Sequence, residues 1–475
     1  MIGDGHAPTT ESPPARPFWT LDRVADALSG GGNLVPHPPG RRPGRDFPRG
    51  SAPLGTVSTD TRSIRPGDLF VALAGERFDA HEFLAQAVER GAAALVVSRT
   101  LVVNSLGVPI FLVPDTLAAL GALGRYRRLA WGKPVVAVAG SNGKTTTKEL
   151  IRAALGSILD VHATTGNLNN LVGVPLTLLA IRDEADLAVI ELGTNVPGEV
   201  PRLRDLVAPE IAVVTSVGEE HMEGLGSLDA ILREETSVYE GATVGIAPSS
   251  QPEIAEAARG KARRVVVAGL EGGDLPITSG LEADGLGWIT LDGVTVRPPI
   301  RGAHNLRNAA LALAVAAECG VTVADAARGI AAMAAPSMRT AWGALGRAIL
   351  INDAYNANPP SMRAALDLLA SSGAGRQRVA ILGTMRELGA HAARLHTAVA
   401  RYALSSGADI VAGVGEMAEA LAAERDDRVV SAPDVAELWP LLEPRLAEDA
   451  VILLKASRGM KLERLLPHLS AWANR

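Results

Sequence analysis

The chain has 475 residues, too many for a single hydrophobic core, so we expect two to four domains. Its hydrophobic content of 47% supports well-packed globular domains, and its net charge of −6 offers no general case for binding nucleic acid or an anionic membrane. The single cysteine, Cys319, excludes a disulfide within the chain and a cysteine-based metal site. No apolar run reaches the length of a membrane span, and the start of the chain lacks the regions of a signal peptide. We therefore expect a cytoplasmic protein, and a monomer.

The first part of the chain is polar and rich in proline. Residues 1–17 are expected to form a disordered tail, and residues 18–28 predict a short amphipathic helix with Thr20 as its N-cap. Residues 30–53 are dense in Gly, Pro and Arg. Their composition favours a flexible surface insertion, and the alternative is an anion-binding arm. The arginines that such an arm would use are Arg41, Arg42, Arg45 and Arg49.

Regular structure returns at Val57. Apolar patterns then predict a strand, a helix, a second strand and a further helix, over residues 69–73, 81–90, 94–98 and 116–129. The alternation of strands and helices indicates a small α/β domain that ends near Pro114.

The central feature of the sequence is the stretch from Val135 to Ile151. Five apolar residues, 135–139, predict a buried parallel strand, the turn Ser141-Asn142-Gly143 follows, and a helix begins at Lys144. Such a strand, glycine turn and helix form a phosphate-binding loop, in which Lys144 adds charge and the Thr145 hydroxyl can bind Mg²⁺. The full P-loop pattern has one more glycine, at the position that Val138 occupies here. The alternative is an ordinary strand-to-helix turn with a chance lysine.

Polar residues also follow the next predicted strands. Glu191 ends the strand over residues 187–190, and His221 lies just beyond the strand over residues 211–215. Ligands of open α/β sheets lie beyond the carboxyl ends of the strands, so these two residues could share Mg²⁺ with Thr145. The simpler interpretations are a solvated loop acid for Glu191 and a packed loop histidine for His221.

The pattern changes after residue 245. Residues 287–291 and 294–296 predict antiparallel additions, and a long Ala/Leu-rich helix ending at Glu318 carries Asn305 in its first turn. A third α/β unit follows, with strands predicted over residues 348–351, 379–382, 410–412 and 451–454. The predicted fold is therefore three successive α/β domains, in which the central parallel sheet carries the P-loop-type turn and the C-terminal domain is Rossmann-like.

Taken together, these segments resemble the Mur ligases, a family of ATP-dependent amide-forming enzymes of peptidoglycan synthesis. The stretch Ala139 to Thr145 is similar to their ATP loop, which lacks the first Walker glycine. Residues 60–62 and 66–73 resemble the uridine-binding signature of two of these enzymes and argue against folylpolyglutamate-type ligases. Residues 166–170 and 353–359 resemble the branch that adds D-alanyl-D-alanine.

The resemblance implies a reaction and a division into domains. Mg-ATP would phosphorylate the terminal carboxylate of UDP-N-acetylmuramoyl-tripeptide, and the amine of D-alanyl-D-alanine would attack the acyl phosphate. The domains would be a UDP-sugar-binding domain, a central ATP-binding domain and a ligase domain, over residues 18–114, 115–335 and 336–475. The alternatives are a ligase that adds another amino acid and a non-catalytic, nucleotide-dependent partner of cell-wall assembly.

The resemblance also implies site residues. Catalytic roles fall on Lys144, Glu191 and His221. The nucleotide would contact Ala139, Gly140, Ser141, Asn142, Gly143, Lys144, Thr145, Asn305, Arg339 and Asp353. The other substrates would contact Asp60, Thr61, Arg62, Asn167, Asn169, Asn170, Tyr355, Asn356 and Asn358.

One departure from the family pattern concerns the metal site. The lysine that is carbamylated in most Mur ligases falls at Glu235, so Mg²⁺ would be held by Thr145, Glu191, His221 and Glu235. A glutamate and a lysine carbamate both present one singly charged carboxylate, but the glutamate stem is shorter. The alternative is that Glu235 is an acid on a helix surface.

Overall fold

The computed structural model describes residues 17–30, 47–75, 78–99, 106–334 and 338–474. The described residues belong to two compact units, Met1–Ala130 and Trp131–Arg475. The predicted tail over residues 1–17 lies outside the described residues except for its last residue, as does most of the insertion over residues 30–53. Of the four arginines in that insertion only Arg49 is described, and it forms an ion pair with Asp26.

The first unit is built on a parallel sheet. Its strands lie in the order β1-β2-β3-β4, with bounds Val57–Ser58, Leu69–Val71, Ala94–Val97 and Ile110–Leu112. Its helices are α1 (Leu21–Gly30), η1 (Thr61–Ser63), η2 (Ala80–Phe83) and α2 (Leu84–Glu89), and α3 (Thr116–Trp131) continues to the boundary with the second unit. The predicted cap is confirmed, because Thr20 Oγ1 accepts a hydrogen bond from the Arg23 amide at 3.2 Å.

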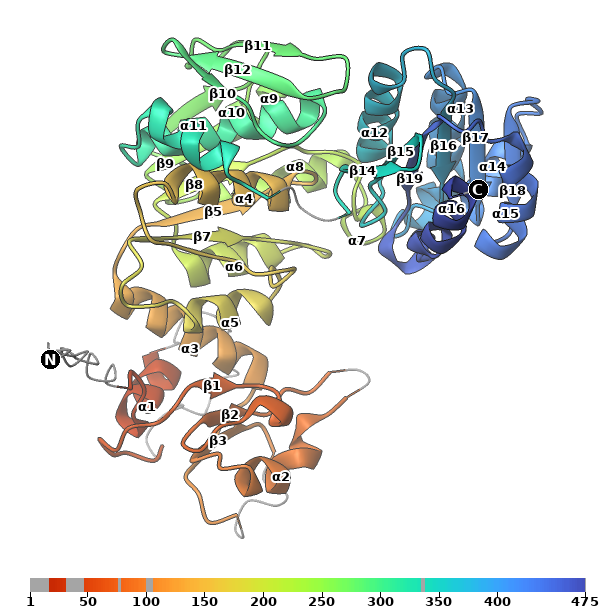
Figure 1. The fold of residues 1–475 in the computed structure, drawn as a ribbon. Coiled ribbons are helices and arrows are strands. Elements are labelled where there is room, and N and C mark those ends of the chain that lie inside the picture. The colour runs from red at the N-terminus through yellow and green to blue at the C-terminus, as the bar shows by residue number, and fades with distance from the viewer. Residues whose placement is uncertain (1–16, 31–46, 76–77, 100–105, 335–337, 475) are drawn as a thin grey trace, which may run out of the picture. The chain divides into compact units, whose positions relative to one another are not determined.

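The second unit contains the predicted central sheet. Six parallel strands lie in the order β10-β9-β8-β5-β7-β6 (Figure 1). In chain order β5 to β10 are Val135–Ala139, Val161–Ala163, Leu187–Glu191, Ile211–Val214, Val244–Pro248 and Arg264–Ala268. The helices are α4 (Lys144–Leu155), α5 (Gly173–Leu179), α6 (Glu199–Val207), α7 (Met222–Leu225), α8 (Leu228–Thr236), η4 (Ser237–Tyr239), α9 (Pro252–Ala258), α10 (Ala303–Glu318) and α11 (Val323–Ala331).

Both faces of this sheet are covered, which is why its strands read as continuous apolar runs. Val136 and Val138 point into a core shared with α4 and α10, where Leu150 and Leu306 are buried. The predicted antiparallel strands are confirmed as a separate sheet, β11 (Thr278–Leu281), β12 (Gly287–Leu291) and β13 (Val294–Val296).

The C-terminal part of the second unit holds another six-stranded sheet, in the order β14-β15-β19-β16-β17-β18. Only β14 is antiparallel to its neighbour. The strands are β14 (Ala341–Leu345), β15 (Ala348–Asn352), β16 (Arg378–Leu382), β17 (Ile410–Val414), β18 (Val429–Ala432) and β19 (Val451–Lys455). The helices are α12 (Pro359–Ser372), η5 (Gly389–His391), α13 (Ala392–Ser405), α14 (Glu416–Ala422), α15 (Val435–Leu442), η6 (Glu443–Arg445), η7 (Arg458–Met460), η8 (Leu462–Leu465) and α16 (Leu466–Ala473).

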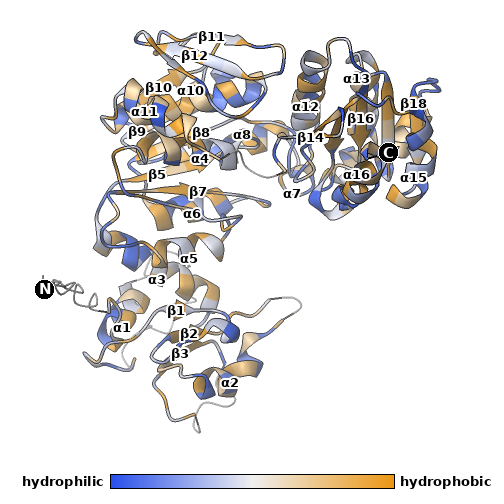
Figure 2. Ribbon diagram, in the orientation of Figure 1, coloured by the Kyte–Doolittle hydropathy of each residue, from blue (hydrophilic) through white to orange (hydrophobic). Residues whose placement is uncertain are grey.

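Alternate residues of these strands enter two cores, one on each face of the sheet. Ala380 and Leu382 pack with α12 and α13, whereas Val379 and Ile381 pack with α15 and α16. Figure 2 shows the resulting concentration of apolar residues in the strands of both large sheets. The fold class is therefore as predicted, with parallel α/β sheets and antiparallel additions. The domain boundaries near residues 114 and 335 stay predictions.

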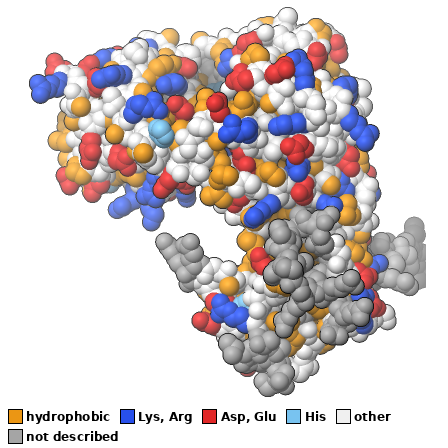
Figure 3. All heavy atoms as spheres, turned by 180° about the vertical axis from the view of Figure 1, so that it is seen from behind, with side chains coloured by type: hydrophobic (Ala, Val, Ile, Leu, Met, Phe, Trp, Pro, Cys, Tyr) orange, Lys and Arg blue, Asp and Glu red, His pale blue; other side chains and the backbone are white. Residues whose placement is uncertain are grey.

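One face of the molecule carries side chains of both charges. Figure 3 shows Lys and Arg side chains interspersed with Asp and Glu on the face it draws. In the described part of the chain no helix is both long and apolar enough to cross a membrane.

Candidate active site

The loop between β5 and α4 is tightly packed against its neighbours, and two of its glycines lie where a side chain would not fit. Gly140 and Gly143 have φ angles of 121° and 85°, which side chains disfavour. A Cβ on Gly140 would lie 2.8 Å from the Thr215 amide nitrogen, and one on Gly143 would lie 2.7 Å from Asn308 Oδ1. The Ser141 amide also donates to the Ser216 carbonyl at 2.7 Å. The loop is thus fixed against the end of β8 and against α10, with the N-terminus of α4 behind it.

Lys144 lies at the centre of the site. Its Nζ donates to the carbonyl oxygens of Gly140 (2.5 Å) and Ser141 (3.2 Å) and lies 3.8 Å from Glu220 Oε2. Burial acts to lower the pKa of Lys144, but attraction to Glu220, and then to Glu235 and Glu191, outweighs it and the pKa is raised. The lysine is therefore a cation held among three carboxylates.

Glu191 is 2% exposed, so the interpretation as a solvated loop acid is wrong. Its amide donates to Thr164 Oγ1 at 2.9 Å, and its Oε1 accepts from Asn169 Nδ2 at 2.9 Å. Its second oxygen, Oε2, is buried without a hydrogen-bond partner. Asn169 is expected from the sequence to contact substrate. In the structure its side-chain amide orients the Glu191 carboxylate.

Glu235 is also 2% exposed, so its interpretation as a surface acid is wrong. It projects from α8, and its Oε2 accepts a hydrogen bond of 2.7 Å from the amide of Gly140. Burial raises the pKa of Glu235 to about 7, against the opposing attraction of Lys144. The shorter stem of glutamate does reach the loop, because α8 lies close to it.

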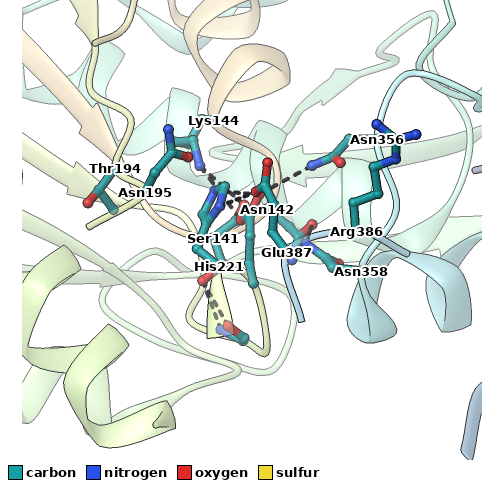
Figure 4. A network of polar contacts seen from close by, with 12 residues as sticks. Ser141, Asn142, Lys144, Thr194, Asn195, His221, Asn356, Asn358, Arg386 and Glu387 are labelled. Atoms are coloured by element: carbon teal, nitrogen blue, oxygen red, sulfur yellow. Dashed lines mark hydrogen bonds and ion pairs between the residues drawn. The ribbon is translucent and has the colours of Figure 1, made fainter. Parts of the chain in front are cut away.

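His221 has its backbone in the left-handed region, with φ 52°. Its Nδ1 lies 2.5 Å from Glu387 Oε2 and its Nε2 lies 3.3 Å from Glu220 Oε1 (Figure 4). The contact with Glu387 is an ion pair without hydrogen-bond geometry. Burial acts to lower the pKa of His221, but these two carboxylates raise it to about 9. His221 therefore carries a positive charge and connects the carboxylates of Glu220 and Glu387, which a packed loop histidine would not do.

Sequence reasoning missed Glu220. This carboxylate is 7% exposed and lies between Lys144 and His221, and its Oε1 also accepts from Asn356 Nδ2 at 3.2 Å. Its Oε2 has no hydrogen-bond partner. Burial acts to raise the pKa of Glu220, but Lys144 outweighs burial and the pKa is lowered, so the group is ionised. The available signal was its place directly before His221 at a strand end.

Two predicted C-terminal residues reach the site, one at the phosphate loop and one at Glu220. Asn356 contacts Glu220, and Asn358 Nδ2 donates to Asn142 Oδ1 at 2.9 Å. Asn358 is 2% exposed, and its Oδ1 also caps α12 by accepting from the Ser361 amide at 3.0 Å. Figure 4 shows these asparagines approaching Asn142 and His221 from the C-terminal sheet.

The other predicted nucleotide residues form a second group. Asn305 Nδ2 lies 3.2 Å from Thr340 Oγ1, and the Thr340 amide donates to Asp353 at 2.9 Å. Asp353 pairs with Lys455 at 2.6 Å. The Arg339 guanidinium lies 4.3 Å from the ring centroid of Tyr355. The structure thus connects Asn305 of α10 with the strand-end loops of the C-terminal sheet.

Other predicted residues are engaged locally. Asp60 and Arg62, in the first unit, form a 2.7 Å ion pair with each other, and Thr61 donates to Gln86. Asn170 Oδ1 accepts from the amide of Gly173 at the start of α5. The Asn167 carbonyl accepts from the Asn169 amide. Their roles with substrate stay predictions.

The donor set fits Mg²⁺ held together with a nucleotide. No three His, Cys, Asp or Glu side chains of the described ranges converge as a complete protein site. Mg²⁺ is usually bound through one or two carboxylates and the phosphates of its substrate, and Glu191 and Glu220 each present a buried oxygen without a hydrogen-bond partner. Thr145 is the second residue of α4 and directly follows Lys144, whose Nζ lies 3.8 Å from Glu220 Oε2. The predicted ligands Thr145, Glu191, His221 and Glu235 stay a prediction.

Three family models match the chain in succession. They are the Mur ligase family catalytic domain at residues 54–128, the Mur ligase middle domain at 138–316, and the Mur ligase glutamate ligase domain at 338–458. The chain belongs to the Mur ligase family. A Bacillus subtilis relative named UDP-N-acetylmuramoyl-tripeptide–D-alanyl-D-alanine ligase is 35% identical over 424 residues, covering 87% of this chain and 92% of the relative.

Solved structures of Mur ligases agree with the fold. A crystal structure of MurF from Acinetobacter baumannii superposes with a TM-score of 0.85 at 31% identity, covering 95% of this chain and 99% of that one. MurF from Thermotoga maritima, solved in complex with ADP, gives a TM-score of 0.80 at 25% identity, covering 88% and 98% of the two chains. The prediction from the sequence motifs that this chain is a Mur ligase is therefore confirmed.

Proposed function

We propose that this Mur ligase joins D-alanyl-D-alanine to UDP-N-acetylmuramoyl-tripeptide in peptidoglycan precursor synthesis. ATP is the phosphoryl donor, and the reaction gives ADP and phosphate. The observation that carries the proposal is the near-full-length similarity to relatives bearing that name. The contact of the Asn356 and Asn358 loop with the phosphate loop supports it, because that loop carries the dipeptide-branch sequence. We place the reaction in the cytoplasm, where ATP is available.

In this proposal the loop amides and Lys144 hold the β- and γ-phosphates. Bound Mg²⁺ supplies neutralisation of the phosphate charge. Glu191, with Asn169 fixing its orientation, Thr145 and Glu235 would hold the metal, together with His221 once its ring has lost its proton to become a neutral ligand. The chain itself supplies positioning and electrostatic stabilisation, which are the main requirements of phosphoryl transfer.

The peptide bond forms in a second step. The dipeptide amine attacks the carbonyl carbon of the acyl phosphate, and the tetrahedral intermediate expels phosphate. Asn356 and Asn358 place the incoming dipeptide from the side of the C-terminal sheet, while Asp60, Thr61 and Arg62 serve the uridine end of the other substrate. Tyr355 serves the incoming substrate with these asparagines, and Asn305, Arg339 and Asp353 serve the nucleotide.

Phosphate release with UDP-N-acetylmuramoyl-tripeptide and Mg-ATP, measured with and without D-alanyl-D-alanine, tests the proposal. We expect release to depend on the dipeptide and to match the pentapeptide product one to one. Release that depends on a single amino acid instead would indicate a ligase of different specificity. Nucleotide binding without any product would favour a non-catalytic partner of cell-wall assembly.

A further inference from the structure

Arg386 lies in the loop that follows β16, residues 383–388, and the backbone of this loop is held in place on both sides. The Arg386 amide donates to Ser457 Oγ at 2.9 Å, and the preceding amide, of Met385, donates to the buried ring of His396 at 2.9 Å. On the other side, the Glu387 carbonyl accepts from the Glu223 amide at 3.1 Å. The side chain of Arg386 therefore starts from a fixed base.

The guanidinium itself lies against the backbone of Gly459. A Cβ at that position would overlap the guanidinium carbon and one terminal nitrogen and would lie 3.0 Å from Nε. Glycine at 459 thus makes room for the arginine head group. The head group therefore lies against the loop after β19, next to Arg458.

Arg386 differs from the other cations of these strand-end loops. Lys455 is buried and pairs with Asp353 at 2.6 Å, and Arg458 pairs with Glu463 at 3.0 Å. In the described residues no carboxylate lies within ion-pair distance of the Arg386 guanidinium, which is exposed. An unpaired guanidinium on a fixed base matches the geometry of a carboxylate ligand.

The position of this loop connects Arg386 to the reacting groups. Its neighbour Glu387 contacts His221, and Asn356, on the loop after β15, contacts Glu220 beside the phosphate loop (Figure 4). A dipeptide whose amine reaches an acyl phosphate there carries its carboxylate roughly 7 Å away, since an extended chain spans about 3.3–3.6 Å per residue. Its negative end needs a cation on the C-terminal side of the site.

We propose that Arg386 binds the C-terminal carboxylate of the incoming dipeptide and thereby selects a free acid as acceptor. The inference rests on the proposed function, of which it specifies one substrate contact. It assigns Arg386 to substrate recognition, separately from the phosphate loop and the candidate metal ligands.

Steady-state kinetics with D-alanyl-D-alanine and with its C-terminal amide test this assignment. The variants are Arg386→Met, which removes the charge, Arg386→Lys, which keeps it, and Arg394→Met as a control. Arg394 is an exposed arginine on α13 of the same domain. Unfolding midpoints and Mg-ADP binding of each variant, measured by calorimetry, establish that the fold and the nucleotide site are intact.

We expect the unmodified enzyme to prefer the acid over the amide, and Arg386→Met to abolish that preference. Its kcat/KM for the acid should fall on the order of tenfold to a hundredfold, mainly through KM, as for loss of a hydrogen-bonded charge pair, with the amide little changed. Arg386→Lys should retain part of the preference, and Arg394→Met all of it. An Arg386→Met enzyme with an unchanged acid-to-amide ratio would overturn the assignment, as would an unmodified enzyme that uses both equally. If the unmodified enzyme joins neither dipeptide to the UDP-linked tripeptide, the proposed function itself fails, and this inference with it.

Discussion

Replacing Lys144 by methionine removes one positive charge from the centre of the site while keeping an apolar stem of similar length. Its Nζ lies 3.8 Å from Glu220, and the two side chains are 12% and 9% exposed. Two unit charges about 4 Å apart interact by roughly 4 kcal/mol at an effective dielectric constant of 20, before desolvation is subtracted. Glu191 and Glu235 also lose their attraction to the lysine.

The loss of folding stability should be smaller than the sum of these terms. Breaking a buried pair typically costs about 3–5 kcal/mol, because a charge is left uncompensated. Here Glu235 has a pKa raised to about 7, so near neutral pH it can take up a proton and relieve the excess negative charge. We therefore expect Lys144→Met to lower the free energy of unfolding by about 2–3 kcal/mol with the fold retained. Ligation should fall by roughly a thousandfold or more, since the charge acts on the transferring phosphoryl group.

Lys133→Met is a matched control. Lys133 precedes β5 at the opposite end of the same strand and donates to the carbonyls of Asp183 (2.9 Å), Glu184 (3.3 Å) and Ala185 (2.7 Å). The Lys133→Met variant should lose about as much free energy of unfolding as Lys144→Met while keeping its turnover. Urea unfolding, phosphate release and product formation are measured for both variants. Near-normal turnover of Lys144→Met would refute the phosphate-loop assignment, and equal loss of turnover in both variants would show that instability alone explains it.

Three further outcomes are expected. Glu235→Gln keeps an acceptor for the Gly140 amide but removes the charge, so it should raise the Mg²⁺ concentration needed for half-maximal turnover. The unmodified enzyme should not require bicarbonate. An unchanged Mg²⁺ dependence of the variant would exclude Glu235 as a metal ligand. Asn358→Ala should raise the KM for the dipeptide more than the KM for the UDP-linked substrate. It should also lower the free energy of unfolding by about 1 kcal/mol, because the cap of α12 is lost. KM values equal to those of the unmodified enzyme would contradict a role of Asn358 in binding the dipeptide. Burial lowers the pKa of His304 from 6.5 to about 4, so between these values the unfolded state binds a proton that the folded state does not, and stability falls as the pH falls. The full shift corresponds to about 3 kcal/mol at pH 4, and we reduce it to about 1–2 kcal/mol because the residue His304 is only partly buried. Urea unfolding of His304→Gln should show a flatter dependence of stability on pH across this window.

The elements near the site could be predicted because their local signals agree. The apolar run of β5, the glycines after it and the helix from Lys144 all point to one strand, turn and helix, and the bounds match. The helix predicted over residues 81–90 is less regular. It begins as a 3₁₀ turn, because Asp79 accepts from the His81 amide, and becomes α-helical at Leu84. A side-chain cap that tightens the first turn is not visible in apolar periodicity.

The contacts that join the two sheets could not be predicted from spacing. Asn356 and Glu220 are 136 residues apart, and Asn358 and Asn142 are 216 apart. Sequence patterns placed each asparagine at a strand end but gave no partner for it. Glu387 was missed for the same reason, because an acid after a strand is common and only the fold brings it to His221.

The same contacts offer a way for the loop between β5 and α4 to respond to the loops of the C-terminal sheet. Glu220 has two oxygens, of which one accepts from Asn356 and the other faces Lys144. A displacement of the Asn356 loop would therefore change the environment of Lys144 without any direct contact between Asn356 and Lys144. Asn358 acts on a different part of the loop, through Asn142. Both links start from the segment that resembles the dipeptide-adding branch. We therefore predict that occupancy of that segment and alignment of the phosphate loop are coupled, so loss of either asparagine should slow phosphate release that depends on the dipeptide.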